Sequence, residues 1–184
     1  MKNAIISVSD KKNIELLAKF LLENEYNIYS SGGTYKYLIE KTESKFHKNI
    51  IDIPSLTGFP EILDGRVKTL HPKIYGGILA NLDIEKHRRE VEDLKIPIFS
   101  VVIVNLYPFE KNNCIENIDI GGVSLIRAAA KNYKYVSVLI DIDDYMSFIY
   151  NYDEIDENYR KNLAKEAFRY TSNYDVLVSN FLIY

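Results

Sequence analysis

The sequence predicts an α/β fold, a three-layer α/β/α sandwich with a mainly parallel sheet, from two observations. Short apolar runs alternate with segments whose apolar residues recur at helical spacing, and strands that alternate with helices pair in parallel. The run at 99–106 (Phe-Ser-Val-Val-Ile-Val-Asn-Leu) is apolar almost throughout, which is typical of a strand covered on both faces in mid-sheet. The other predicted strands are 4–8, 26–30, 49–53 and 135–140.

Helices are predicted between these strands. The first spans about 11–24, with Ser9 and Asp10 before it as good N-cap residues. Residues 55–77 are rich in glycine, proline and charge and show no clear periodicity, so we expect a long irregular segment with a function. The remaining helices are expected after the turn at 31–34, over 83–94, from Gly121 onward, and over about 157–180.

The length of 184 residues suits one domain or a domain with an appendage. We expect residues 1–150 to form the α/β domain and residues 151–184 a C-terminal helical extension. A hydrophobic content of 47% is ample for a core, so no metal or disulfide is needed to hold the fold. Cys114 is the only cysteine, which excludes an internal disulfide and a cysteine-rich metal site.

Charge and hydropathy exclude several classes of protein. The formal net charge of −3 argues against broad nucleic-acid binding but does not exclude a local cationic pocket for a phosphate. The apolar run near the N-terminus is too short for a signal peptide, and no stretch is long enough for a membrane helix. We therefore expect a cytoplasmic protein with no nucleic-acid or membrane partner.

Segment 64–72 combines two cations with turn-forming residues. Gly65 allows a sharp turn, and Pro72 disfavours the helical conformation at His71. Arg66 and Lys68 should therefore lie close together on an exposed loop, where an anionic, phosphorylated substrate would neutralise them. A solvated surface turn is the competing interpretation, and the segment by itself favours neither.

Ligands of parallel sheets bind where the strands end, so the loops there hold the candidate site. The turn at 31–34, Ser-Gly-Gly-Thr, exposes backbone N–H groups at a helix start and can bind a phosphate or serve as a plain N-cap turn. Asn105 can hydrogen-bond a base or amide, and Tyr107 can relay a proton or only cap the core. Asp119 and Lys131 are expected on either side of one helix start, as an acid–base pair or an ordinary ion pair.

Other catalytic patterns are missing. His47, His71 and His87 lack metal-ligand spacing, and the sequence contains no Ser-His-Asp elbow, Walker loop or dinucleotide fingerprint.

Seven motifs occur together in a fixed order and resemble the inosine monophosphate (IMP) cyclohydrolase domain of the bifunctional purine-biosynthesis proteins. The resemblance spans nearly the whole chain, and the ordered set makes it specific. The motifs are Ser7-Val8-Ser9-Asp10-Lys11, Ser31-Gly32-Gly33-Thr34, Thr57-Gly58-Phe59-Pro60-Glu61, Gly65-Arg66-Val67-Lys68-Thr69-Leu70-His71-Pro72, Asn105-Leu106-Tyr107-Pro108-Phe109, Ile118-Asp119-Ile120-Gly121-Gly122 and Arg127-Ala128-Ala129-Ala130-Lys131-Asn132.

The resemblance implies a methylglyoxal-synthase-like α/β/α domain that closes the ring of 5-formamidoimidazole-4-carboxamide ribonucleotide to give IMP and water. It implies no metal and no organic cofactor. Because the carboxamide nitrogen attacks the formyl carbon and the formyl oxygen leaves as water, catalysis consists of proton transfers and charge stabilisation.

The resemblance also implies residue roles. Lys68 and Tyr107 would assist proton transfer, Asp119 and Lys131 would form a second acid–base pair, and the nucleotide phosphate would lie on the glycine turn beside Lys11. Arg66 would orient the ligand and the loop, and Val104 would offer only backbone and packing. The substrate-binding set is Ser9, Asp10, Lys11, Ser31, Gly32, Gly33, Thr34, Arg66, Val67, Thr69, Val104, Asn105, Ile120 and Gly121.

The implied partners are the nucleotide substrate, the IMP product, a second copy in a homodimer and a formyltransferase domain in a longer chain. We expect the last helix to be partly exposed or paired with another subunit. Two alternatives share the fold: a nucleotide-sensing regulatory domain and methylglyoxal synthase. A sensor needs the phosphate turn but not Lys68, Tyr107 and Asp119 together with Lys131, and the catalytic pattern of methylglyoxal synthase is not evident.

Overall fold

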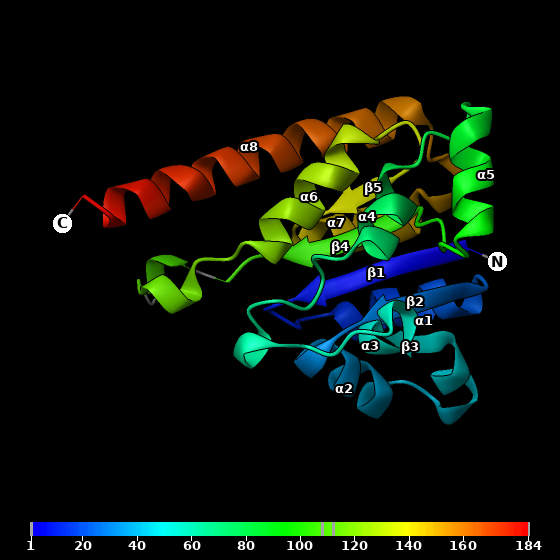
Figure 1. The fold of residues 1–184 in the computed structure, drawn as a ribbon, viewed down its shortest axis with the longest axis horizontal. Helices are drawn as coiled ribbons and strands as arrows, with labels where there is room; N and C mark the ends of the chain where they lie inside the picture. The colour runs from blue at the N-terminus through cyan, green and yellow to red at the C-terminus, as the bar shows by residue number, and fades with distance from the viewer. Residues whose placement is uncertain (1, 108, 112, 184) are drawn as a thin grey trace.

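The structure is a computed structural model that describes residues 2–107, 109–111 and 113–183. Pro108, which belongs to one of the seven motifs, lies outside these residues. Five parallel strands form one sheet in the order β3-β2-β1-β4-β5 (Figure 1), which confirms the predicted parallel sheet. The strands are β1 (Lys2–Val8), β2 (Tyr26–Ser30), β3 (Ile50–Asp52), β4 (Val101–Asn105) and β5 (Ser137–Leu139).

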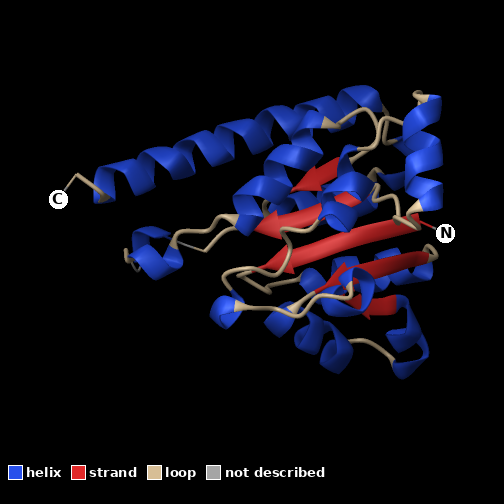
Figure 2. Ribbon diagram, viewed as in Figure 1, coloured by secondary structure: helices blue, strands red, loops and turns tan. Residues whose placement is uncertain are grey.

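Helices cover both faces of this sheet (Figure 2). On one face α1 packs against β2 and α7, and on the other α6 packs against β4, β5, α4 and α8. The α-helices are α1 (Ile14–Glu23), α2 (Gly32–Lys41), α3 (Ile53–Thr57), α4 (Pro72–Leu79), α5 (Glu85–Asp93), α6 (Gly121–Lys131), α7 (Ile142–Tyr150) and α8 (Glu157–Phe181). Short 3₁₀ turns are η1 (Ser44–Asn49), η2 (Leu63–Gly65), η3 (Phe109–Lys111), η4 (Ile115–Asn117) and η5 (Tyr152–Glu154).

The prediction for β4 is confirmed. Its first four residues are at most 1% exposed, and it lies between β1 and β5 inside the sheet. An apolar run can form a strand here because helices shield both faces. The core continues through β1, where Ala4, Ile5 and Ile6 are fully buried.

Two local expectations were wrong, and one helix was missed. Residues 55–77 are not irregular throughout, because the segment contains most of α3 and most of α4, and His71 is the N-cap of α4, its Nδ1 accepting from the amide of Lys73 at 3.1 Å. Helix α1 starts after Asn13, which has φ of +61°, so neither Ser9 nor Asp10 is its N-cap. Helix α7 was not predicted; Asp141 starts it with a capping box.

Helix α8 runs along α6 and extends past the strand ends toward the C-terminus (Figure 1). It is anchored by buried residues such as Leu163 and Ala167 in its first half and Tyr174 further along. Near its end Val176 and Leu182 are 56% and 62% exposed, in agreement with the expected partial exposure. The described residues contain no helix that is both long and apolar enough to cross a membrane.

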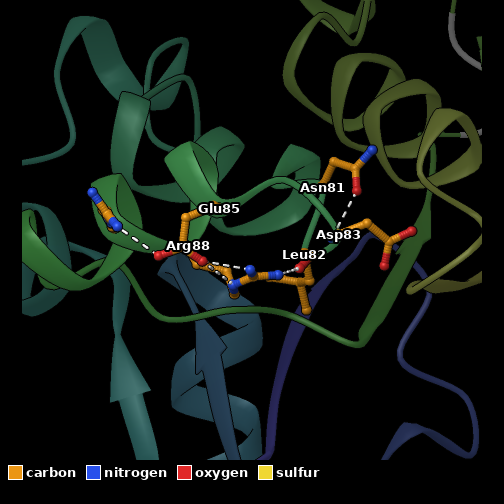
Figure 3. Close-up of polar contacts among 6 residues, drawn as sticks. Asn81, Leu82, Asp83, Glu85 and Arg88 are labelled. Atoms are coloured by element: carbon orange, nitrogen blue, oxygen red, sulfur yellow. Dashed lines mark hydrogen bonds and ion pairs between the residues drawn. The ribbon is translucent and has the colours of Figure 1, made fainter.

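A polar network fixes the corner between α4 and α5, at the amino-terminal edge of the sheet (Figures 1 and 3). The Arg88 guanidinium donates to the Leu82 carbonyl and to the Glu85 carboxylate, both at 2.5 Å. The amide of Asp83 donates to Asn81 Oδ1 at 3.0 Å. This network is far from the carboxyl ends of the strands, so we assign it a structural role.

Candidate functional site

The candidate site lies where β1, β2 and β4 end. These strands are adjacent and parallel, so their following loops meet at one edge of the sheet. The hydroxyls at this edge are partly used inside the protein. Ser30 Oγ donates to the Ile6 carbonyl at 2.7 Å, and Thr34 Oγ1 donates to the Val8 carbonyl at 3.0 Å. Thr34 therefore ties the glycine turn to β1 through the donor hydrogen of its side chain.

Asn105 joins the loops that follow β1 and β4. Its Oδ1 accepts from the amides of Ser9 and Asp10 at 2.7 and 2.9 Å, and its Nδ2 donates to the Asp10 carbonyl at 2.9 Å. The side chain that the sequence suggested for ligand contact is therefore mainly a clamp. It fixes the backbone of the loop that carries Lys11.

The glycine turn starts α2 and carries mixed charge. Ser31, its N-cap, makes no side-chain capping bond, and Gly32 has φ of +53°, a left-handed conformation that favours glycine. A Cβ on Gly33 would lie 4.0 Å from Lys11 Nζ, so the ammonium group is beside the turn as expected. A Cβ on Gly32 would lie 3.6 Å from Glu61 Oε1.

Glu61 was not among the predicted site residues. Its carboxylate faces the turn that would hold a phosphate, and its charge adds to burial in raising the pKa of Asp52 above the usual range. The contact joins residues nearly thirty positions apart, so only the folded loop could identify it.

The loop with the two cations has unusual backbone conformations. Leu63, Asp64 and Gly65 have φ of +54°, +53° and +86° in succession, and Ile62 pairs with Val67 in an antiparallel bridge. Left-handed φ at a leucine is strained and persists only where surrounding contacts impose it. The conformation brings Lys68 Nζ back over the turn, 3.6 Å from where a Cβ on Gly65 would lie.

Asp119 lies at the start of α6, close to this loop. Burial raises the pKa of its carboxyl, while the Gly122 amide, which donates to Oδ1 at 2.6 Å, and the charge of Lys68 oppose the rise. A Cβ on Gly121 would lie 3.0 Å from Thr69 Oγ1, so the loop packs directly on the helix start. Lys68, Thr69, Asp119 and Gly121 are therefore brought together.

Helix α8 supports the Asp119 region through two tyrosines. Tyr174 Oη accepts from the Asp119 amide at 2.7 Å and donates to the Asn117 carbonyl at 3.3 Å. Tyr170 Oη accepts from the Leu106 amide at 3.2 Å. Sequence reasoning missed both residues. Their spacing of four placed them on one helix face but gave no indication of which loops they would contact.

The other predicted site residues differ in their contacts and exposure. Arg66 forms an exposed ion pair with Glu116. Val104 is 1% exposed, which agrees with a packing role, and Tyr107 and Ile120 are 49% and 59% exposed at the same edge.

Lys131 does not flank the helix start as predicted. It is the last residue of α6, whereas Asp119 precedes the first, which separates them by about 15 Å along the helix axis. The two residues belong to consecutive motifs of the sequence, but the rise of the helix between them keeps them apart in space.

Lys131 instead lines a hollow between α6 and α8, which we call the α6–α8 groove. Its volume is about 620 Å³. The lining residues are Leu79, Arg127, Ala128, Ala130, Lys131, Tyr133, Lys161, Ala164, Lys165 and Phe168.

Comparison with known proteins adds a family relationship to this geometry. A family model described as "MGS-like domain" matches residues 13–134, and one described as "AICARFT/IMPCHase bienzyme" matches residues 129–184. A solved structure described as "Crystal structure of ForH" has a TM-score of 0.87 to this chain and 33% sequence identity, and the match covers 99% of this chain and 97% of that one.

Two curated relatives share the name "Bifunctional purine biosynthesis protein PurH". The protein of Prochlorococcus marinus (strain AS9601) is 48% identical over 190 residues, which cover 97% of this chain and 36% of the relative. The protein of Thermoanaerobacter sp. (strain X514) is 47% identical over 194 residues, which cover 99% and 37%. The chain thus spans little more than a third of the length of these relatives.

Proposed function

The chain belongs to the MGS-like domain family, and from this premise we propose that it is an IMP cyclohydrolase. The substrate would be 5-formamidoimidazole-4-carboxamide ribonucleotide, and the products IMP and water. The observation that carries the proposal is the placement of the 66–69 loop against the start of α6, which brings the charge of Lys68 to act on the half-buried carboxyl of Asp119. The similarity to proteins named for purine biosynthesis and the match to the bienzyme family model support it.

The reaction needs a base and an acid close together. The carboxamide nitrogen attacks the formyl carbon and loses one proton. The formamide nitrogen loses a second proton as its double bond to that carbon forms, and the former formyl oxygen gains two protons and leaves as water. In our proposal the Asp119 carboxylate accepts the proton from nitrogen, since a raised pKa makes it a better base than an ordinary aspartate. The Lys68 ammonium stabilises charge on the formyl oxygen and donates a proton as it departs.

The remaining site residues would hold the nucleotide. The phosphate would lie on the glycine turn, where the first amides of α2 and the Lys11 ammonium offer positive charge. Tyr107, exposed at the same edge, would assist proton transfer, and Arg66 would orient the loop through Glu116. Lys131 has no role in this proposal, because it lies at the other end of α6.

The proposal is tested by mixing the protein with the formylated ribonucleotide and following the ultraviolet change as the second ring closes. We expect acceleration over the spontaneous reaction, with loss of about 10²–10⁴-fold in Lys68→Ala and in Asp119→Ala. Lys131→Ala is the matched control and should retain most of the rate. Ring closure at the spontaneous rate with wild-type protein would refute the function.

Two assembly proposals accompany the enzymatic one. We expect a homodimer, to be checked by light scattering coupled to size-exclusion chromatography. We also expect that a formyltransferase domain accompanies this domain in full-length relatives, as their bifunctional name suggests.

A further inference from the structure

The α6–α8 groove is lined by four cations, in a chain whose net charge is negative. Helices α6 and α8 run antiparallel, because Arg160 at the start of α8 donates to the Tyr133 carbonyl just after α6, while Tyr174 contacts Asp119 just before α6. Arg127 is therefore level with Lys165, and Lys131 with Lys161. Each helix contributes two cations one turn apart to the groove.

These four cations have no anionic partner in the described part of the chain. None of them forms an ion pair there, and no aspartate or glutamate lines the groove. Like charges one helical turn apart repel, so the arrangement costs stability while the groove is empty. The chain carries a net charge of −3, and on α5 the cations Lys86 and Arg89 pair with carboxylates of their own helix, which the groove cations do not.

The groove also offers an apolar and aromatic surface. Ala128 and Ala164 form its floor, and Phe168 is 40% exposed, with the Arg127 guanidinium 5.4 Å from its ring centre. Leu79 at the end of α4 adds a second exposed apolar side chain. The volume of about 620 Å³ is within the range of roughly 300–1,000 Å³ that is usual for small-molecule sites.

We propose that the α6–α8 groove is a second ligand site of this protein, for a small organic anion with at least two negative charges on an apolar, ring-sized body. The anionic group lies between the α6 cations and the α8 cations, and the ring packs on Phe168 and the alanine floor. A compact ligand fits better than a bare inorganic anion, because the floor between the cations is apolar. The groove is separate from the strand-end site, since Lys131 and Asp119 are at opposite ends of α6.

The test uses 1-naphthyl phosphate as the probe, a dianion at pH 8 on a two-ring body, with binding measured by equilibrium dialysis and fluorescence. We expect saturable binding that weakens at least about tenfold in the double variant Arg127→Gln/Lys165→Gln, which removes two charge-assisted contacts. The exposed pair Lys36→Gln/Lys48→Gln on α2 and η1, on the other side of the molecule, is the matched control and should bind as wild type does. Circular dichroism of each variant confirms the fold.

A second pair of controls separates the groove from the strand-end site. Lys11→Gln should leave the groove affinity unchanged, and neutral 1-naphthol and inorganic phosphate should each bind far more weakly than the probe. Probe binding that is lost in Lys11→Gln but kept in the groove variant would overturn the proposal, as would absence of saturable binding to wild type. Equal binding of 1-naphthol would also overturn it, because the cations would then be irrelevant. Ring-closure activity is not a readout here, so failure of this test leaves the proposed enzymatic function intact.

Discussion

Gly122 and Asp119 are in such close contact that no side chain fits between them. The Gly122 amide donates to Asp119 Oδ1 at 2.6 Å, and a Cβ on Gly122 would lie 2.7 Å from Oδ2 and 2.8 Å from Leu106 Cδ2. The glycine therefore lets the carboxylate sit directly on the first turn of α6, where the helix N-terminus and Lys68 can act on its charge.

Replacing Gly122 should disable the site without touching a catalytic group. In Gly122→Ala the new methyl group must displace the Asp119 carboxylate, so we expect ring-closure activity to fall about 10²-fold or more. Gly76→Ala is the matched control, because its Cβ meets only the Ile96 side chain, at 3.1 and 3.7 Å. Its activity should stay near wild type. Full activity in Gly122→Ala would mean that the position of Asp119 does not limit the reaction.

The ionised carboxylate of Asp119 should lower the free energy of unfolding near pH 7. Its folded-state pKa is raised above the ordinary value of 3.8, so the folded protein holds this proton more tightly than the unfolded chain. Its contribution to the free energy of unfolding is most favourable below pH 3.8 and is lost as pH rises through the folded-state pKa. Asp119→Asn should therefore be more stable than wild type at pH 7, and the gain should shrink toward pH 4. Urea unfolding at several pH values measures both.

The raised pKa of Asp119 also predicts that activity falls at acidic pH. If the Asp119 carboxylate is the base, kcat/KM should fall on acidification through a pKa above 3.8. Lys68→Met should move this acidic limb to higher pH, because the lysine charge lowers the Asp119 pKa. If the acidic limb of the pH profile does not move in Lys68→Met, the lysine charge does not influence the pKa of Asp119.

Asn105 should matter for both stability and substrate affinity. In Asn105→Ala the amides of Ser9 and Asp10 lose their shared acceptor, which should lower the free energy of unfolding by about 1–3 kcal/mol. The loop that carries Lys11 should loosen, so KM for the ribonucleotide should rise more than kcat falls. Chemical denaturation and steady-state kinetics check these two effects. Asn162→Ala, an exposed change on α8, is the control and should alter neither.

Glu61 should compete with the substrate phosphate. Its carboxylate faces the glycine turn, so Glu61→Gln removes a negative charge from the proposed phosphate site and should tighten ribonucleotide binding about three- to tenfold. Calorimetric titration of IMP measures the change, and Glu40→Gln near the far end of α2 is the control. Weaker binding in Glu61→Gln would show instead that the carboxylate contacts the ligand, for example its ribose hydroxyls.

The sequence by itself determined the sheet and the edge that carries the site. The apolar run of β4 could be stable only in mid-sheet, and parallel strands bring the loops after Val8, Ser30 and Asn105 to one edge whatever the details of packing. The sharp turn at Gly65 was also predicted, because glycine has no Cβ and accepts the observed φ of +86°.

Tertiary structure decided which side chains act together. Glu61 reaches Gly32, Tyr174 holds the Asp119 amide, and Asn105 clamps the loop after β1 through contacts between residues far apart in the chain. Such contacts depend on how loops fold back onto helices, which neither periodicity nor motif order records. For Lys131 the motifs predicted a proximity that the structure does not have. They placed it beside Asp119, but the rise of α6 puts it on a different surface, where it lies beside cations of α8.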